Sequence, residues 1–279
     1  MSQISSGLEW DMRLERELFK HARHFDAIEV IPENFFFAER IQLTESLRRL
    51  KATKKPILFH GVELSIGSSE PLKRDHLSNM MRLMEILEPT VYSEHLSMTE
   101  ASGVEIGQLT PLLWTKELAD YIAQKIRYVQ ASVGIPFLIE NISNRFVLPY
   151  TEITETNFIN RILNSAKCGL LLDITNVLTN SVNYDFDPYI WIDALDLSFV
   201  RQIHLAGGAR DSDNVLEDSH DQAVWDESWQ LYAYVIRKLG PIPTVIERTG
   251  NIPQFDSLVQ EAKKARQIQE TYGLTAMAA

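Results

Sequence analysis

Six short apolar runs in this chain each end in a residue type that binds metal ions. PILFH, VYSEH and RQIH end in histidine, whereas FLIE, LLLD and TVIE end in a carboxylate. The six residues are His60, His95, Glu140, Asp173, His204 and Glu247. Several buried carboxylates repel one another and lose hydration, and a cation among them removes both penalties. Mixed imidazole and carboxylate ligands favour Zn, Mn, Fe or Co over Ca or Mg.

Three more residues are candidates for the same centre. Asn176 follows Asp173 in the segment LLLDITN, and Asp218 and His220 stand two positions apart in EDSHD. In an extended segment, residues two apart point to the same side, so the Asp218–His220 pair could clasp one further ion.

Other histidines and acids have plainer interpretations. A single histidine at a strand end is usually a hydrogen-bonded core or cleft residue, so the metal hypothesis depends on the whole set. We expect His21 and His24 to be solvated on a helix, and His76 to lie at the surface or at a helix start. Glu29 and Glu33 flank one apolar run, where Glu33 could reach the rim of a pocket or serve a structural role.

The elements that must position these residues are eight apolar runs separated by helical patterns. Most of the runs lack strict alternation, which is typical of strands covered on both sides in a parallel sheet. The expected strands are Gln3–Leu8, Ala27–Pro32, Pro56–Val62, Thr90–Leu96, Pro136–Ile142, Gly169–Ile174, Phe199–Ala206 and Pro243–Arg248. Apolar residues at helical spacing follow Trp114 and Phe255, among other places.

This alternation predicts a TIM-type (β/α)8 barrel, with a doubly wound open sheet as the alternative. No GxGxxG or Walker sequence follows an early strand, which disfavours a nucleotide-binding sheet. In a parallel barrel all strands end on one face, where active sites lie. The ligand candidates would therefore converge there, although 30 or more residues separate some of them in sequence.

Composition sets the class of protein. The chain has 279 residues, a net charge of −11 and one cysteine, Cys168. This predicts a single barrel domain over residues 1–272, followed by a C-terminal tail over 273–279. The acidic charge argues against nucleic acid as a partner, and the absence of a long apolar run or signal-like start predicts a cytoplasmic protein without membrane association. Cys168 precedes its strand, so we expect it at the opposite end of the barrel from the ligands.

Longer motifs carry a family resemblance. HGVELSIGSSEPL, SEHLSM, LIENIS, GLLLDITNV, QIHLAGG, DSHDQAV and TVIERTGNIP occur in that order, spanning roughly Phe25 to Ala265. Together they resemble the multinuclear non-haem iron-dependent oxidative enzymes that modify peptide cysteines in methanobactin and thiaglutamate biosynthesis. The resemblance implies a xylose-isomerase-like TIM barrel that binds two or three iron ions, mixed Fe(II) and Fe(III), with dioxygen as co-substrate.

The resemblance also assigns residues. It implies a catalytic role for Glu140 and His95, with Glu140 bridging irons. The implied iron ligands are His60, His95, Glu140, Asp173, His204, Asp218, His220 and Glu247. Asn176 stands where related endonuclease IV barrels carry histidine, so its metal position would be coordinated differently.

The substrate and partner implied by the resemblance are a cysteine-containing precursor peptide and a protein that binds its leader, giving a heterodimer. The reaction would be excision of the cysteine β-carbon or a similar rearrangement. Phe35, Phe36 and Phe37 either form an exposed part of the partner interface or pack against the adjacent helix.

Three rival functions remain open on the same residues. A sugar isomerase or epimerase would use Mn, Co or Mg, but no lysine stands at an expected strand end. A zinc phosphodiesterase is disfavoured by the acidic charge and by Asn176. A protein that stores or senses metal without turnover is the non-enzymatic alternative.

Overall fold

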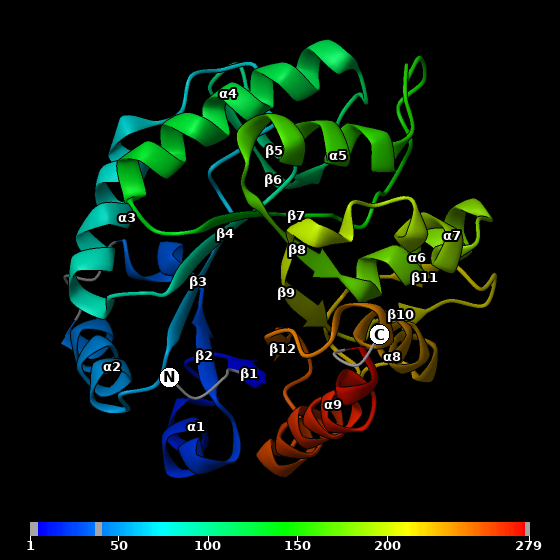
Figure 1. The fold of residues 1–279 in the computed structure, drawn as a ribbon. Helices are drawn as coiled ribbons and strands as arrows, with labels where there is room; N and C mark the ends of the chain where they lie inside the picture. Colours follow the sequence, from blue (N-terminus) through cyan, green and yellow to red (C-terminus); the bar gives the residue numbers. More distant parts are fainter. Residues whose placement is uncertain (1–4, 37–40, 277–279) are drawn as a thin grey trace.

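The computed structural model describes residues 5–36 and 41–276 and consists of a closed parallel barrel ringed by helices (Figure 1). Around the barrel the strand order is β1-β12-β9-β8-β7-β4-β3-β2. The barrel strands are β1 (Ser6–Glu9), β2 (Ala27–Val30), β3 (Ile57–Gly61), β4 (Val91–His95), β7 (Phe137–Glu140), β8 (Gly169–Asp173), β9 (Val200–Leu205) and β12 (Thr244–Ile246). All of the described barrel pairings are parallel, which confirms the TIM-type prediction.

The strands coincide with the eight predicted runs, shortened by a few residues at their ends. The first differs most, because β1 continues through Glu9 and Gln3 lies outside the described residues. Nearly every strand residue is buried, as expected where helices cover the outer face of a parallel sheet.

Helices follow most strands and pack on the outside of the barrel. They are α1 (Glu15–Lys20), α2 (Ile41–Ala52), α3 (Arg74–Leu87), α4 (Lys116–Val133), α5 (Glu155–Ala166), α6 (Ile174–Tyr184), α7 (Pro188–Asp193), α8 (Asp226–Leu239) and α9 (Phe255–Ala276). Short 3₁₀ turns are η1 (Ala22–His24), η2 (Pro32–Phe35) and η3 (Leu197–Phe199). None of the helices in the described residues is both long and apolar enough to cross a membrane.

Helix α4 illustrates how local sequence sets these boundaries. The Thr115 side chain accepts a hydrogen bond from the Leu118 amide and so caps the first turn. Gly134 ends the helix in a left-handed conformation with φ of 68°. Between them, Ile122, Ile126 and other apolar residues at helical spacing are fully buried against the barrel.

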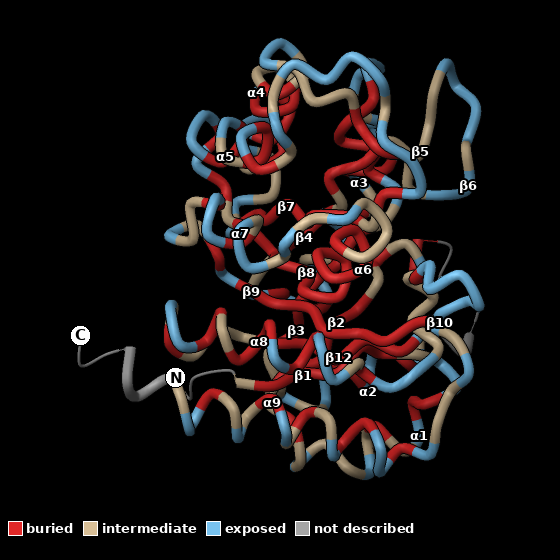
Figure 2. Tube along the Cα trace, turned by 90° about the vertical axis from the view of Figure 1, so that its right-hand side faces the viewer, coloured by how far each residue is buried: buried red, intermediate tan, exposed pale blue. Residues whose placement is uncertain are grey.

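Two small hairpins are inserted after barrel strands. β5 (Met98–Ala101) pairs with β6 (Val104–Thr110) after β4, and β10 (Ala209–Arg210) pairs with β11 (Leu216–Glu217) after β9. The trace coloured by burial shows a buried centre with the β5–β6 hairpin projecting from it (Figure 2). Both hairpins follow the carboxyl ends of their strands and therefore flank the catalytic face of such a barrel.

The opposite end of the barrel is apolar. Inside it, Ala27, Leu58 and Val245 form a buried cluster with Val91 packed against it. Cys168, which directly precedes β8, is also buried, and burial raises the pKa of its thiol to about 12. Its position confirms the expectation that it lies away from the ligand residues.

The boundary between domain and tail stays a prediction. Helix α9 continues through Ala276, past the predicted boundary at residue 272, and residues 277–279 lie outside the described part of the chain.

Candidate metal centre

Each of the eight barrel strands brings one ionisable side chain into the lumen near its carboxyl end. Successive strand residues face opposite sides of the sheet, so these residues stand two positions above the apolar layer. In β3, for example, Leu58 faces the lower lumen and His60 the upper lumen. The full layer consists of Glu9, Glu29, His60, His95, Glu140, Asp173, His204 and Glu247, the last directly following β12.

Glu140 occupies the centre of this layer. Its Oε2 lies 3.3 Å from His60 Nε2 and 3.1 Å from His95 Nε2. Its Oε1 lies 3.0 Å from Nδ1 of His204. One carboxylate therefore faces three imidazoles through both of its oxygens.

The far ring nitrogens of two histidines are held by other groups. His60 Nδ1 lies 2.9 Å from Ser93 Oγ, which itself donates to the Phe59 carbonyl. His95 Nδ1 lies 3.2 Å from the Gly61 carbonyl oxygen, which can only accept. These contacts leave Nε2 of both rings facing Glu140, and metal-ligating histidines are commonly oriented in this way.

His204 is oriented in the reverse sense. Its Nδ1 faces Glu140 and also lies 3.2 Å from Glu247 Oε1, whereas its Nε2 lies 2.9 Å from Glu29 Oε1. Gln202 donates to Glu29 Oε2 at 2.5 Å and fixes that carboxylate in turn. Glu29 can therefore hold the His204 ring so that Nδ1 is the nitrogen presented to a metal.

Asp173 and Asn176 join the layer from the start of α6. Asp173 Oδ1 accepts from the Asn176 amide at 2.6 Å and caps the helix, which leaves Oδ2 without a hydrogen bond. The Asn176 side chain donates to the Asn141 carbonyl, and its Oδ1 has no hydrogen-bond partner. One oxygen of each side chain is thus buried and available.

Asp218 and His220 reach the layer from the loop after β11. His220 Nε2 lies 2.7 Å from Asp218 Oδ1, and its Nδ1 lies 3.7 Å from Glu247 Oε2. Ser143 donates to the other Asp218 oxygen at 3.0 Å. The two side chains are 14% and 18% exposed, so this pair forms part of the mouth of the barrel.

The imidazoles of the layer lower the pKa of Glu140, but they do not offset all of its carboxylates. Burial, reinforced by neighbouring carboxylates, raises the pKa of Asp173 well above its usual range, and burial with Glu247 raises the pKa of Glu9 to about 8. Burial opposes protonation of His204 and His220, but neighbouring carboxylates raise the pKa of both imidazoles. Glu247 and Glu29 raise the pKa of His204, and Asp218 and Glu247 raise that of His220.

The donor atoms fit a multinuclear metal centre. Among the residues of this layer and its rim, seven carboxylate or imidazole atoms are buried without a hydrogen-bond partner: Glu29 Oε1, Glu140 Oε2, Asp173 Oδ2, His204 Nδ1, Asp218 Oδ1, His220 Nε2 and Glu247 Oε2. Ligand atoms lie within 4.8 Å of one another in two sets that share Glu140, namely His60–His95–Glu140 and Glu140–Asp173–His204–Glu247. These sets can hold separate ions joined by one carboxylate.

Two cavities border the layer or its rim. One of about 440 Å³ is lined by His95 and by Leu109 of the β5–β6 hairpin, and another of about 450 Å³ is lined by Asp218 and Leu216 beside the β10–β11 hairpin. An extended substrate could therefore approach the ligand layer from either hairpin.

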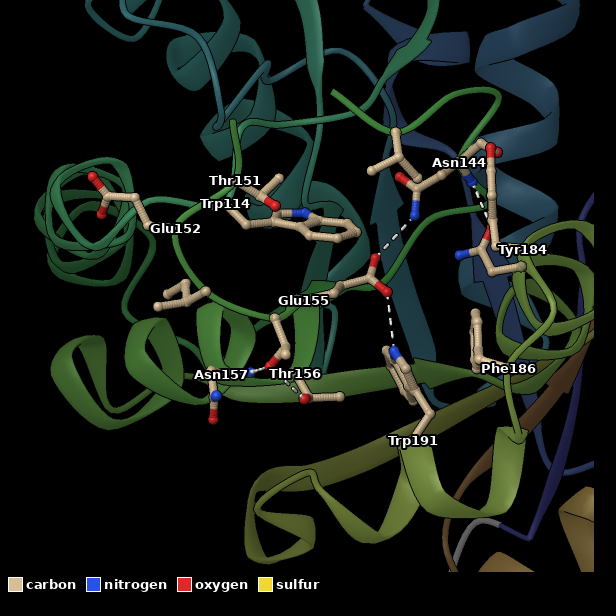
Figure 3. Close-up of a pocket in the computed structure, with 14 residues that line it drawn as sticks. Trp114, Asn144, Thr151, Glu152, Glu155, Thr156, Asn157, Tyr184, Phe186 and Trp191 are labelled. Atoms are coloured by element: carbon tan, nitrogen blue, oxygen red, sulfur yellow. Dashed lines mark hydrogen bonds between the residues drawn. The ribbon is translucent and has the colours of Figure 1, made fainter. Parts of the chain in front are cut away.

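A third cavity, of about 610 Å³, has no predicted ligand in its lining. Figure 3 shows the Glu155 carboxylate between Asn144 and Trp191, with the Trp114 ring also lining the cavity. Asn144 Nδ2 and Trp191 Nε1 both donate to this carboxylate at 3.0 Å.

All nine predicted site residues come together in this layer or at its rim. Sequence reasoning missed Glu9 and left Glu29 as a flanking residue, although both follow the same pattern of an acid at a strand end.

The expectation for His76 was right about the helix start and wrong about the surface, because its side chain is 7% exposed. Phe35 and Phe36 are buried, so packing rather than an exposed interface is correct for both; Phe37 lies outside the described residues.

Comparisons with solved structures support the fold. D-psicose 3-epimerase from Clostridium cellulolyticum matches with a TM-score of 0.61 and 13% identity, over 96% of this chain and 99% of that chain. A xylose-isomerase-like TIM barrel protein from Mycobacterium smegmatis, in complex with magnesium, matches with a TM-score of 0.57 and 15% identity over 94% and 89%. At these identities the likeness is one of fold alone.

Sequence comparisons are more specific. A UPF0276 protein of Acaryochloris marina is 40% identical over 75% of this chain and 76% of its own length. Another from Acinetobacter baylyi is 36% identical over 88% and 85%. The family model described as "RiPP precursor modification enzyme MbnB/TglH/ChrH" matches residues 5–270. The chain therefore belongs to this family of enzymes, which modify the precursors of ribosomally synthesised peptides.

Proposed function

We propose that this protein uses a multinuclear non-haem iron centre and dioxygen to oxidise a cysteine of a ribosomally made precursor peptide. The observation that carries the proposal is Glu140, whose two oxygens face three imidazoles in a lumen lined by further carboxylates. The family supplies the substrate class, a peptide precursor. Iron, dioxygen and cysteine are the finer part of the proposal and rest on the motif resemblance.

The residues would divide among two or three ions. His60, His95 and Glu140 would hold one ion, and Glu140 would bridge it to a second held by Asp173, His204 and Glu247. Asp218 and His220, with Glu247, would hold a third ion nearest the mouth, with the free Asn176 oxygen close to the second or third position. Bound iron in mixed ferrous and ferric states would supply redox electrons and open positions for thiolate and dioxygen.

The protein's own groups would position and enclose the reaction. Glu29 would hold the His204 ring, and Ser93 and the Gly61 carbonyl would hold His60 and His95. His95, at 14% exposed, borders the cavity beside the β5–β6 hairpin, so a cysteine side chain entering there would meet the centre. Dioxygen would be the oxidant: in β-carbon excision the CH2 group and one O2 would leave as formic acid, and the thiol would remain on the α-carbon.

We also propose a heterodimer with a protein that binds the leader of the precursor peptide. Because Phe35 and Phe36 are buried, they do not provide its interface. Peptide affinity measured with and without the partner tests this step. We expect weak binding by the isolated chain and recovery of binding when the partner is added.

The decisive test is dioxygen consumption by anaerobically iron-loaded protein given the precursor peptide, with mass spectrometry of the product. We expect dioxygen uptake and a mass change confined to the cysteine residue, and neither with a peptide in which serine replaces that cysteine. Epimerisation of a free sugar without dioxygen uptake would instead favour the isomerase class to which several structural neighbours belong.

A further inference from the structure

A second cluster of ligand-type side chains lies outside the barrel lumen. It consists of Glu33 on η2, His76 on α3 and Glu94 on β4. In β4 the neighbouring residue His95 faces the lumen, so Glu94 faces the layer between the barrel and α3. Gly61 leaves space for it, because a Cβ at that position would collide with the Glu94 carboxylate.

The three side chains converge without bonding to one another. His76 Nε2 lies 3.5 Å from Glu33 Oε1 and 3.9 Å from Glu94 Oε1, and one ligand atom from each residue lies within 4.8 Å of the others. The side chains of His76 and Glu33 are only 7% and 6% exposed. His76 Nε2 and Glu33 Oε2 nevertheless have no hydrogen-bond partner in the described structure. Leaving such atoms buried is costly, so each requires a physical explanation.

Neighbouring groups already hold two of the ligands in place. The amides of Val62 and Glu63 donate to Glu33 Oε1 at 3.1 and 3.3 Å, which leaves Oε2 for another partner. The Tyr92 hydroxyl donates to Glu94 Oε1 at 2.5 Å. Carboxylates that bind metal ions are commonly hydrogen-bonded by surrounding groups in this way.

The ring of His76 is held by Phe36, whose ring lies 5.0 Å away in an edge-on arrangement. The nearest ammonium group, on Lys73, is paired with Glu100 and Glu105 across the adjacent cavity.

We propose that Glu33, His76 and Glu94 bind one divalent first-row transition-metal ion, separate from the lumen centre. One imidazole and two carboxylates suit ions of the Mn, Fe, Co and Zn class. His76 and His95 line the same cavity of about 440 Å³, so the ion would have open positions on the side from which a substrate can reach the lumen. Three protein ligands with an open position is the usual composition of a site that also binds an exogenous group.

Metal counting tests the proposal without using activity. The metal-free protein would be equilibrated anaerobically with Mn²⁺, and the bound metal per chain would be measured by elemental mass spectrometry. We expect His76→Asn and Glu33→Gln each to bind one ion fewer per chain than the unsubstituted protein. His21→Asn, which removes a histidine just after α1 and away from the cluster, should bind the full number, and circular dichroism would confirm that all variants are folded.

A second comparison separates this site from the lumen. The Glu140→Ala substitution weakens the lumen centre. In that background, adding His76→Asn should still lower the metal content by one ion per chain. It should also remove the electron paramagnetic resonance signal of an isolated Mn²⁺. Equal metal content with and without His76 in both backgrounds would overturn the proposal. Failure of the cysteine-peptide reaction would leave this count unchanged, so the two proposals can fail separately.

Discussion

The two ends of the barrel lumen are built from the same strands and differ in their chemistry. At the amino end, Ala27, Leu58 and Val245 pack together as an apolar cluster. Two residues further along the same strands stand Glu29, His60 and Glu247. One strand period therefore separates a mostly apolar layer from a layer of carboxylates and imidazoles.

This difference shows how the barrel can fold although one end of its lumen contains buried charged groups. Burial of apolar side chains at the amino end and around the helices drives folding, whereas the carboxyl end carries buried charge that burial alone destabilises. We expect substitutions at one end to change unfolding free energy and substitutions at the other to change metal content.

The largest effect is expected for Glu140→Ala. Removing the carboxylate that faces three imidazoles should lower iron content and abolish turnover of the cysteine peptide, because no other described side chain contacts all three rings. Iron per chain and dioxygen uptake are the measurements, and Glu155→Gln, a carboxylate change outside the lumen, is the control. Full activity in the alanine variant would refute the assignment.

A substitution at the apolar end should give the opposite pattern. Leu58 is 2% exposed, so Leu58→Ala should lower the free energy of unfolding by about 2–5 kcal/mol. Urea denaturation of the metal-free protein measures the loss. The metal content of the folded variant should stay at the wild-type value. A loss of metal like that of the Glu140 variant would show that the two ends of the lumen do not have separate roles.

A smaller effect on metal binding is expected for Glu29→Gln, which distinguishes metal ligands from positioning residues within the charged layer. We place Glu29 behind His204 as a positioning residue, and loss of such a partner typically lowers metal affinity about 10–100-fold. Chelator competition would measure this change. Loss of a whole ion would show that Glu29 is itself a ligand, and an unchanged affinity would remove its positioning role.

The smallest effect concerns Glu155, a carboxylate held by hydrogen-bond donors rather than by a cation. Burial raises its pKa from 4.5 to about 7, although Asn144 and Trp191 donate to it. The folded state therefore favours the protonated acid, and stability relative to Glu155→Gln should fall as pH rises from about 4.5 to about 7, then stay constant. Urea denaturation of both proteins near pH 5 and pH 8 measures this, and an equal difference at both values would contradict it.

Much of the barrel could be predicted because its strands are continuous apolar runs and its ligands stand at their ends. The parallel arrangement then brings His60 and Glu247 together without any sequence proximity. Glu9 was missed because β1 is short and its acid is followed by Trp10 rather than by a recognisable motif.

Residues outside the lumen were harder to predict. His76 lies on an amphipathic helix, and its burial depends on Phe36 and Glu33, which come from a distant turn. Helical spacing alone cannot identify such partners. The burial of Phe35 and Phe36 has the same origin, because an apolar loop sequence does not specify which helix covers it.

The central claim is that the lumen layer holds several irons joined through Glu140. Metal analysis of anaerobically purified, iron-57-enriched protein, combined with Mössbauer spectroscopy, tests it most directly. We expect two or more irons per chain, magnetically coupled and partly ferrous. Stoichiometric zinc or manganese with little iron would contradict it and favour a hydrolase or isomerase on the same barrel.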